Sequence, residues 1–156
     1  MSTFEIRPAK AADIPCLMSV VDGTELFPGE MLAGMMSPFL SGEGSDDIWL
    51  TCELNCEVIG FCYAAPEKLT DGTWNMLAIA VHPSCQGKGA GAAIVRHLEL
   101  ILRGHGHRVI VVDTSGTPEF ARTRAFYRNN GYAEEARIRD FWANGNDKIV
   151  FWKRFA

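Results

Sequence analysis

The stretch Val81-His82-Pro83-Ser84-Cys85-Gln86-Gly87-Lys88-Gly89-Ala90-Gly91 decides how the fold is interpreted. An apolar run over 76–81 leads into it and an amphipathic helical pattern leaves it, so the glycines are predicted to form a strand-to-helix turn. Glycine lets a backbone approach a ligand closely, because it has no Cβ. The first amides of the following helix lack partners within the helix, and the helix dipole adds positive potential there. With the charge of Lys88, the stretch predicts a pyrophosphate-binding loop.

Length and composition indicate one soluble globular domain over residues 1–156. The chain is 47% hydrophobic and 22% charged, and its net charge of -4 argues against a nucleic-acid partner. No apolar run has the length of a membrane span and the N-terminus has no signal-peptide pattern, so we expect a cytoplasmic protein without a membrane partner. The five cysteines show no CxxC pair and no histidine at zinc spacing, which predicts reduced thiols and no metal site.

The remaining pattern predicts an α+β fold with a mixed, mostly antiparallel central sheet flanked by helices. The β-branched run over 109–112 predicts a central strand, covered on both faces and parallel to the strand before the glycine turn. One βαβ crossover therefore lies at that turn, and Asn144-Gly145 marks a C-terminal hairpin. Gly131 is predicted to end a helix in the left-handed conformation. The predicted strands are 4–7, 48–54, 57–65, 74–81, 109–112, 133–141 and 148–155, and the predicted helices are 11–21, 28–40, 118–129 and the segment after the glycine turn.

Three interpretations of the glycine turn compete. A Walker loop needs Ser or Thr after Gly-Lys, and Gly89 stands there instead. A dinucleotide fingerprint is matched by Gly87, Gly89 and Ala92, with Asp113 about twenty residues further on. However, residues 83–86 separate the strand from the glycines, and the chain lacks the alternating βαβ pattern of such a domain. A dinucleotide-binding oxidoreductase is therefore the weaker alternative.

The third interpretation rests on two motifs. Gln86-x-x-Gly89-x-Gly91 after the strand end Ile79-Ala80-Val81-His82-Pro83 resembles the acetyl-CoA signature of the GCN5-related N-acetyltransferase (GNAT) family. Ala125-Phe126-Tyr127-Arg128-Asn129-Asn130-Gly131-Tyr132 resembles the later helix of that family, and the order of elements agrees along the chain. The resemblance implies transfer of acetyl from acetyl-CoA to a primary amine of a small molecule, amino acid or peptide, directly and without metal. Homodimers are frequent in that family, so a homodimer is a further expectation from the resemblance.

The resemblance assigns the cofactor contacts to two neighbouring segments. Backbone groups of Ile79, Ala80 and Val81 would pair with pantetheine like an extra strand, on an edge that the family opens with a bulge. The Val81 N–H would face the thioester oxygen. The residues whose amides would hold the pyrophosphate are Gln86, Gly87, Lys88, Gly89, Ala90 and Gly91.

Tyr127 is the predicted general acid and a further cofactor contact. A phenol has a pKa of about 10 and a thiol about 8.5, so the phenol is protonated at neutral pH and donates as the thiolate forms. Arg122 and Arg124 are further candidates for the cofactor phosphates.

The general base is not evident from the motifs. Many relatives carry a carboxylate on the strand before the glycine turn, but residues 74–78 contain none, and Asn75 cannot act as a base. Glu30 and Asp140 are the candidate proton acceptors, and Asp140 with Asp147 could hold the charge of the acceptor. The missing strand carboxylate leaves a non-catalytic acyl-CoA-binding module as an alternative, against which Tyr127 argues.

Overall fold

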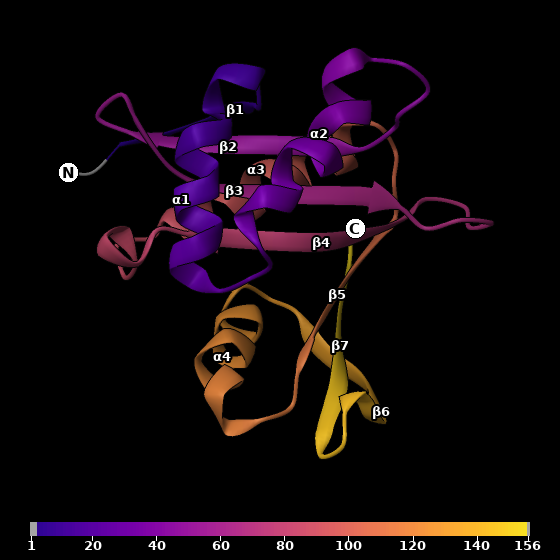
Figure 1. Ribbon diagram of the computed structural model, residues 1–156. Coiled ribbons are helices and arrows are strands. Elements are labelled where there is room, and N and C mark those ends of the chain that lie inside the picture. The colour runs from indigo at the N-terminus through magenta and orange to yellow at the C-terminus, as the bar shows by residue number, and fades with distance from the viewer. Residues whose placement is uncertain (1–2, 156) are drawn as a thin grey trace. The chain divides into compact units, whose positions relative to one another are not determined.

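A computed structural model describes residues 3–155, and Figure 1 shows its helices and strands. The order of elements is the one predicted from the sequence. In chain order the elements are β1 (Phe4–Pro8), α1 (Ile14–Thr24), α2 (Leu32–Ser41), β2 (Ile48–Leu54), β3 (Glu57–Pro66), β4 (Thr73–Val81), α3 (Ala90–Gly104), β5 (Val109–Ser115), α4 (Ala121–Asn129), β6 (Ala133–Ala143) and β7 (Asn146–Arg154).

Three predicted helix starts are too early, because the chain first makes a tighter 3-10 turn. Such turns cover Ala11–Asp13, Gly29–Met31 and Pro118–Phe120. In the last two, i→i+3 hydrogen bonds run from Met31 N–H to the Pro28 carbonyl (3.0 Å) and from Phe120 N–H to the Thr117 carbonyl (3.1 Å). Tight turns of this kind are frequent at helix ends, and sequence periodicity alone does not separate them from the α-helix that follows.

The strands form one seven-stranded sheet in the order β1-β2-β3-β4-β5-β7-β6 among the described residues. β4 and β5 are parallel, whereas β1–β2, β2–β3, β5–β7 and β6–β7 are antiparallel. The predicted mixed sheet, with its parallel crossover and closing hairpin, is confirmed. β5 is central, but its burial alternates: Ile110 and Val112 are buried, and Val109 and Val111 only half-buried. The expectation that both of its faces are covered is therefore met on one face only.

The chain forms two compact units. The first comprises the residues up to Ala65 together with Leu77–Leu102, and the second comprises Pro66–Met76 together with the residues from Arg103 onward. In the first unit, α1 and α2 lie on one side of β2 and β3, and α3 lies behind them (Figure 1). The core on the α1 and α2 side contains a fully buried Trp49, whose ring stacks on Tyr63 and Phe61 at centroid distances of 4.2 and 5.9 Å.

A buried ion pair fixes β1 to the segment before α1. The Arg7 guanidinium donates two hydrogen bonds of 2.8 Å to the carboxylate of Asp13, which is only 3% exposed. The Thr51 hydroxyl (3.1 Å) and the Lys10 N–H (3.0 Å) donate to the same carboxylate. Burial alone would raise the pKa of Asp13, but the hydrogen bonds from Arg7, Lys10 and Thr51 hold that pKa below its ordinary value.

Asp13→Asn is expected to lower the free energy of unfolding by about 3 kcal/mol at neutral pH, because Arg7 loses its two 2.8 Å bonds to a buried carboxylate and keeps only the 3.3 Å pair with Glu53. Since the folded-state pKa is lowered, this stability is present above the unfolded pKa of about 3.9 and is lost as pH falls through the folded value. Urea unfolding at several pH values measures the difference. Glu134→Gln, which breaks an exposed pair with Arg128 (3.4 Å), serves as the control and should change little. Equal effects of the two variants would contradict the structural role of Asp13.

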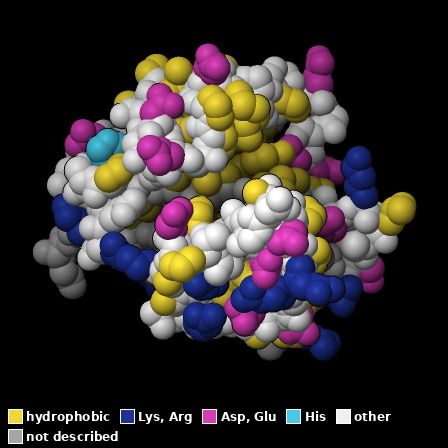
Figure 2. Space-filling model, turned by 60° about the horizontal axis from the view of Figure 1, so that its bottom comes forward, with side chains coloured by type: hydrophobic (Ala, Val, Ile, Leu, Met, Phe, Trp, Pro, Cys, Tyr) yellow, Lys and Arg dark blue, Asp and Glu magenta, His cyan; other side chains and the backbone are white. Residues whose placement is uncertain are grey.

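Acidic, basic and apolar side chains are interspersed on the face shown in Figure 2. No helix within residues 3–155 is long and apolar enough to cross a membrane.

Candidate active site

The glycine turn forms a cradle of free amides at the start of α3. Gly87 and Gly89 have φ of +79° and +92°, in the left-handed region that glycine enters without strain. Apart from the chain neighbours of each glycine, no atom of residues 3–155 lies within 4 Å of a Cβ placed on Gly87, and only a ring carbon of Phe4, at 3.9 Å, lies near one on Gly89. The first bond from an amide of α3 runs from Ala93 N–H to the Gly89 carbonyl (3.1 Å). The N–H groups of the preceding helix residues are therefore available to an anion.

Two side chains fix the shape of this cradle. The Gln86 side chain donates from Nε2 to the Val81 carbonyl (2.9 Å) and so joins the end of β4 to the start of the turn. His82 accepts from the Ser84 N–H (3.2 Å) and caps the short turn at Pro83–Cys85. The predicted role of Gln86 thus gains a side-chain contribution that the motif alone did not indicate.

The other predicted members of the cradle differ in their surroundings. Lys88 is exposed and forms no ion pair with residues 3–155. Ala90 is 2% exposed, so its methyl group packs in the core while its amide lies at the start of the helix. Gly91 lies inside α3 without a positive φ, so its backbone does not require glycine.

β4 leads into the cradle with an edge that β5 does not pair. Its ladder with β5 is confined to Thr73–Asn75 opposite Val109–Val111, and among the described residues no pair follows. The Ala80 carbonyl lies beside Gly60 of β3, and the His82 N–H donates to the Ile59 carbonyl (2.7 Å). Because backbone groups alternate along a strand, the N–H groups of Ile79 and Val81 face the other edge. Ile79 and Val81 therefore offer their amides there, whereas Ala80 faces β3.

Gly60 sets how closely β3 approaches this part of β4. A Cβ at Gly60 would lie 2.8 Å from the Ala80 carbonyl oxygen, 3.3 Å from a methyl carbon of Val81 and 3.4 Å from Ile94. Strand alternation places the small residues Gly60, Cys62 and Ala64 on one face of β3. The contact between Gly60 and Ile94 shows that this face lies against α3. The backbone carbonyl cannot move without moving β4.

Gly60→Ala is expected to cost about 2 kcal/mol of stability and to weaken acetyl-CoA binding, because the added methyl group displaces the β4 backbone. Gly34→Ala is the matched control, since a Cβ at Gly34 of α2 meets no atom of the described part of the chain within 4 Å. That control should be neutral or slightly stabilising. Chemical denaturation and calorimetric titration with acetyl-CoA measure both effects. Unchanged affinity in a destabilised Gly60→Ala protein would show that β4 geometry does not govern binding.

Tyr127 lies in the second unit, at the end of α4. It is 4% exposed, and its ring lies against Phe151 and Tyr132 at centroid distances of 5.3 and 5.9 Å. Burial raises its pKa well above the ordinary value, so the phenol stays protonated at neutral pH. No hydrogen bond reaches its hydroxyl from residues 3–155, and that oxygen is not one of their buried, unpartnered atoms. The small exposed fraction of Tyr127 therefore includes its hydroxyl.

The end of α4 is closed as the sequence predicts. Gly131 has a φ of +89°, and its N–H donates to the Arg128 carbonyl (3.1 Å). The Tyr132 N–H donates to the Tyr127 carbonyl (3.0 Å), which completes a Schellman motif. The backbone of Tyr127 is thereby fixed.

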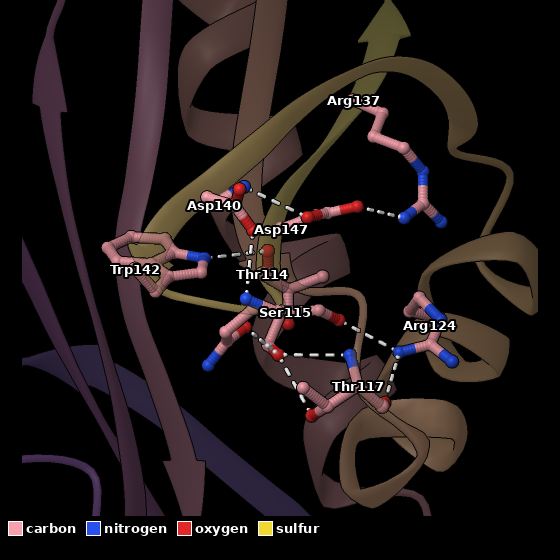
Figure 3. A network of polar contacts seen from close by, with 10 residues as sticks. Thr114, Ser115, Thr117, Arg124, Arg137, Asp140, Trp142 and Asp147 are labelled. Atoms are coloured by element: carbon pink, nitrogen blue, oxygen red, sulfur yellow. Dashed lines mark hydrogen bonds and ion pairs between the residues drawn. The ribbon is translucent and has the colours of Figure 1, made fainter.

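Asp140 and Asp147 form a structural cluster in the C-terminal hairpin (Figure 3). Asp140 has a φ of +54°, its N–H donates to Asp147 Oδ1 (2.9 Å), and its own Oδ1 accepts from the Gly145 N–H (2.8 Å). The Asp140 N–H and then the Arg137 guanidinium lower the pKa of Asp147. Asp147 and the Oδ1 atom of Asp140 are thus engaged within the hairpin.

Arg122 and Arg124 of α4, the two candidates for the cofactor phosphates, differ in their surroundings. Arg124 donates to the carbonyls of Ser115 and Thr117, both at 2.8 Å, and so braces the loop before α4 (Figure 3). Arg122 is exposed. Glu30 is exposed in the turn before α2, within the first unit, while Tyr127 and Asp140 belong to the second.

An unpaired strand edge followed by a turn with free amides has the geometry that suits an extended ligand with an anionic group. The comparisons with known proteins agree. A family model described as "Acetyltransferase (GNAT) domain" matches residues 45–134, more than half of the chain. The chain therefore belongs to the GNAT family.

Solved structures show the same fold. A putative GNAT acetyltransferase from Desulfovibrio desulfuricans superposes with a TM-score of 0.86 at 25% identity, over 100% of each chain. The ribosomal-protein-S18-alanine N-acetyltransferase from Escherichia coli gives 0.79 at 19%, over 99% of this chain and 95% of that one. YncA, a putative acetyltransferase from Salmonella typhimurium solved with acetyl-CoA, gives 0.77 at 20%, over 98% and 94%. The predicted enzyme class, an acetyltransferase of the GNAT family, is confirmed by the family model, and one of these solved structures, YncA, holds acetyl-CoA.

Two features near the site escaped the sequence analysis. Gly60 has its effect through the neighbouring strand, and the alternation of small residues in β3 was the only signal for it. Glu67 accepts a hydrogen bond from Asn75 (2.9 Å), although only Asn75 drew attention in the sequence. Asp113, which supported the dinucleotide alternative, pairs with Lys148 (3.3 Å) in a sheet that is mixed and not doubly wound.

Proposed function

We propose that this single-domain protein transfers acetyl directly from acetyl-CoA to the primary amine of a small molecule, amino acid or peptide. The observation that carries the proposal is the β4 edge and its cradle. The amides of Ile79 and Val81 face the edge that β5 leaves unpaired, and the turn after the strand holds Gly87 and Gly89 with φ of +79° and +92°. The space beside these glycines suits the close approach of a pyrophosphate.

In this proposal a particular part of the chain performs each task of the transfer: binding the cosubstrate, stabilising the oxyanion and protonating the leaving thiolate. The amides of the cradle hold the pyrophosphate, and the amides of Ile79 and Val81 hold the extended arm. Bound acetyl-CoA supplies an activated acyl group. The Val81 N–H stabilises the developing oxyanion, and preorganised donors of this kind contribute most in sites that exclude water. Tyr127 gives its hydroxyl proton to the leaving sulfur, and burial favours the protonated state that this role requires.

The proposal is tested by the release of free thiol from acetyl-CoA in the presence of a panel of primary amines. The panel should include amino acids, polyamines and peptides with free N-termini, and mass spectrometry should identify each product. We expect at least one amine to accelerate release and to gain an acetyl group. Calorimetric titration with acetyl-CoA, with NAD and ATP as controls, runs in parallel. Acetyl-CoA binding without transfer to any amine would favour the non-catalytic binding module instead.

A further inference from the structure

The peptide groups on either side of Val81 have a fixed orientation. The Ala80 carbonyl, which shares a peptide group with the Val81 N–H, lies against Gly60 of β3. The His82 N–H, which shares the next peptide group with the Val81 carbonyl, donates to the Ile59 carbonyl of β3 (2.7 Å). The N–H and the carbonyl of a trans peptide point in opposite directions, and residues 3–155 contain no cis peptide. Both polar backbone groups of Val81 therefore point to the edge of β4 that faces away from β3.

The Gln86 side chain occupies one of these two groups. Its Nε2 donates to the Val81 carbonyl at 2.9 Å. The orientation of the Gln86 amide follows from this contact, because only Nε2 can donate to a carbonyl. No side chain of residues 3–155 forms a hydrogen bond with the Val81 N–H. At this edge Val81 thus offers a free donor and an acceptor that is already engaged.

The backbone of the turn after β4 brings Gln86 back to Val81. The Cys85 N–H donates to the His82 carbonyl (2.8 Å), and the Gln86 N–H donates to the Pro83 carbonyl through a longer contact of 3.5 Å. A Cβ on Gly23 would lie 3.1 Å from Pro83 Cδ, so the end of α1 packs directly against this turn. These contacts do not involve the Gln86 side chain, so we expect the turn to persist when that side chain is replaced.

Folding alone gives little reason for the bond between Gln86 and Val81. Gln86 is exposed and Val81 is half-buried. Where water reaches a carbonyl, water replaces a side-chain donor at little net cost. Substitutions of exposed side chains also change stability little. The consequence of the bond therefore lies in what another molecule can bind at Val81.

The engaged carbonyl changes which part of a bound arm Val81 favours. A strand-like partner forms two hydrogen bonds with such a residue, one to its N–H and one to its carbonyl. The part of an extended arm that carries amides could form both, whereas a thioester has no donor and forms only the bond to the N–H. A carbonyl can accept a second hydrogen bond, but a donor gains less from an acceptor that is already satisfied. Gln86 thus removes the advantage of the amides at this position.

We propose that Gln86 is a positioning residue of the acetyl transfer, whose side chain sets the register of the bound arm on β4. The thioester oxygen, and not an amide of the arm, then takes the Val81 N–H. This inference rests on the proposed function, in which that N–H stabilises the oxyanion. Without the Gln86 donor, the arm can slide further along β4 until its amides pair with both groups of Val81. The acyl carbon is then carried past its donor, which stabilises the oxyanion only when the oxygen lies opposite it.

Two substitutions of Gln86 test this role by kinetics. Methionine has the same length and no donor, and Gln86→Met is expected to lower kcat at least about 10-fold while the KM for acetyl-CoA changes less than about 3-fold. Gln86→Arg keeps N–H donors on a side chain of similar reach and should recover most of kcat. Thiol release with an amine that the wild type acetylates measures both constants. A merely structural Gln86 would instead weaken the binding of acetyl-CoA and of CoA to the same extent.

A second measurement reports on the register without turnover. Ala80-Val81 is the only Ala-Val pair in the sequence, so alanine labelled at its carbonyl carbon and valine labelled with nitrogen-15 select the Val81 amide resonance. Titrations compare acetyl-CoA with CoA, which carries a thiol in place of the thioester. In the wild type, acetyl-CoA should move the Val81 amide proton further downfield than CoA does. In Gln86→Met the two ligands should give the same shift, and in Gln86→Arg the difference should return.

These outcomes distinguish the inference from the proposed function. Unchanged kcat in Gln86→Met, or an equal loss of affinity for acetyl-CoA and CoA, would overturn the role of Gln86 and leave the transferase intact. If the wild type binds acetyl-CoA but acetylates no amine, the proposed function fails, and the Val81 resonance still decides whether Gln86 sets the register. A difference between the two ligands that Gln86→Met abolishes supports that role. A difference that Gln86→Met retains, or equal shifts in the wild type, would overturn it.

Discussion

Gly89→Val is expected to abolish measurable acetyl-CoA binding while the protein stays folded. Gly89 has a φ of +92°, a conformation that costs a β-branched residue about 1–3 kcal/mol. Among residues 3–155, a Cβ there would meet only the Phe4 ring carbon at 3.9 Å, so no clash with these residues forces unfolding. The valine side chain would instead occupy the space beside the free amides of α3. We expect affinity to fall at least about 100-fold, because both the backbone geometry and the close approach are lost.

Gly106→Val separates these two causes. Gly106 has a φ of +79° in the turn before β5, and a Cβ there meets no atom of the described residues within 4 Å. Both variants should lose similar stability in urea, because both strain a left-handed backbone. Calorimetric titration with acetyl-CoA should then show normal affinity in Gly106→Val and none in Gly89→Val. Tight binding by a folded Gly89→Val protein would refute the assignment of the cradle.

The cradle was predictable because its determinants are local in the sequence. Glycine reaches a positive φ without strain, so glycines between a predicted strand and a predicted helix indicate a turn. Gly87 and Gly89 are such glycines, and both have a positive φ. Gly131 marks the end of α4 for the same reason. Period-2 and helical patterns likewise specify which face of each element is buried, and the order of elements follows from them.

Side-chain contacts across loops were not predictable in this way. Asp140 stays a candidate base, and only the structure showed that its Oδ1 accepts from the Gly145 N–H within the hairpin. The Glu67–Asn75 contact depends on hydrogen bonds of Thr70 and Thr73 in the loop between the two residues. The hydrophobic periodicity of the sequence does not predict such hydrogen bonds. The sequence showed that β4 lacks a carboxylate. Only the structure showed which neighbouring segment brings one there.

Tyr127→Phe is expected to lower kcat by tens to hundreds of fold and to leave acetyl-CoA affinity and stability nearly unchanged. No residue from 3 to 155 bonds to the Tyr127 hydroxyl, so its removal leaves no partner unsatisfied in the core. The ring contacts with Phe151 and Tyr132 remain in the variant. A loss of rate without a loss of stability would therefore report on proton donation alone.

Tyr63→Phe provides the matched control, because the Tyr63 hydroxyl donates to Asp47 (3.1 Å) at a half-buried position in the first unit. It should lose about 1 kcal/mol of stability and keep its turnover. The pH profile gives an independent check. Burial raises the pKa of Tyr127, and a general acid acts only while protonated, so wild-type kcat should not fall with rising pH until well above about pH 10. Wild-type turnover in Tyr127→Phe would exclude the tyrosine as the acid and assign protonation of the thiolate to solvent.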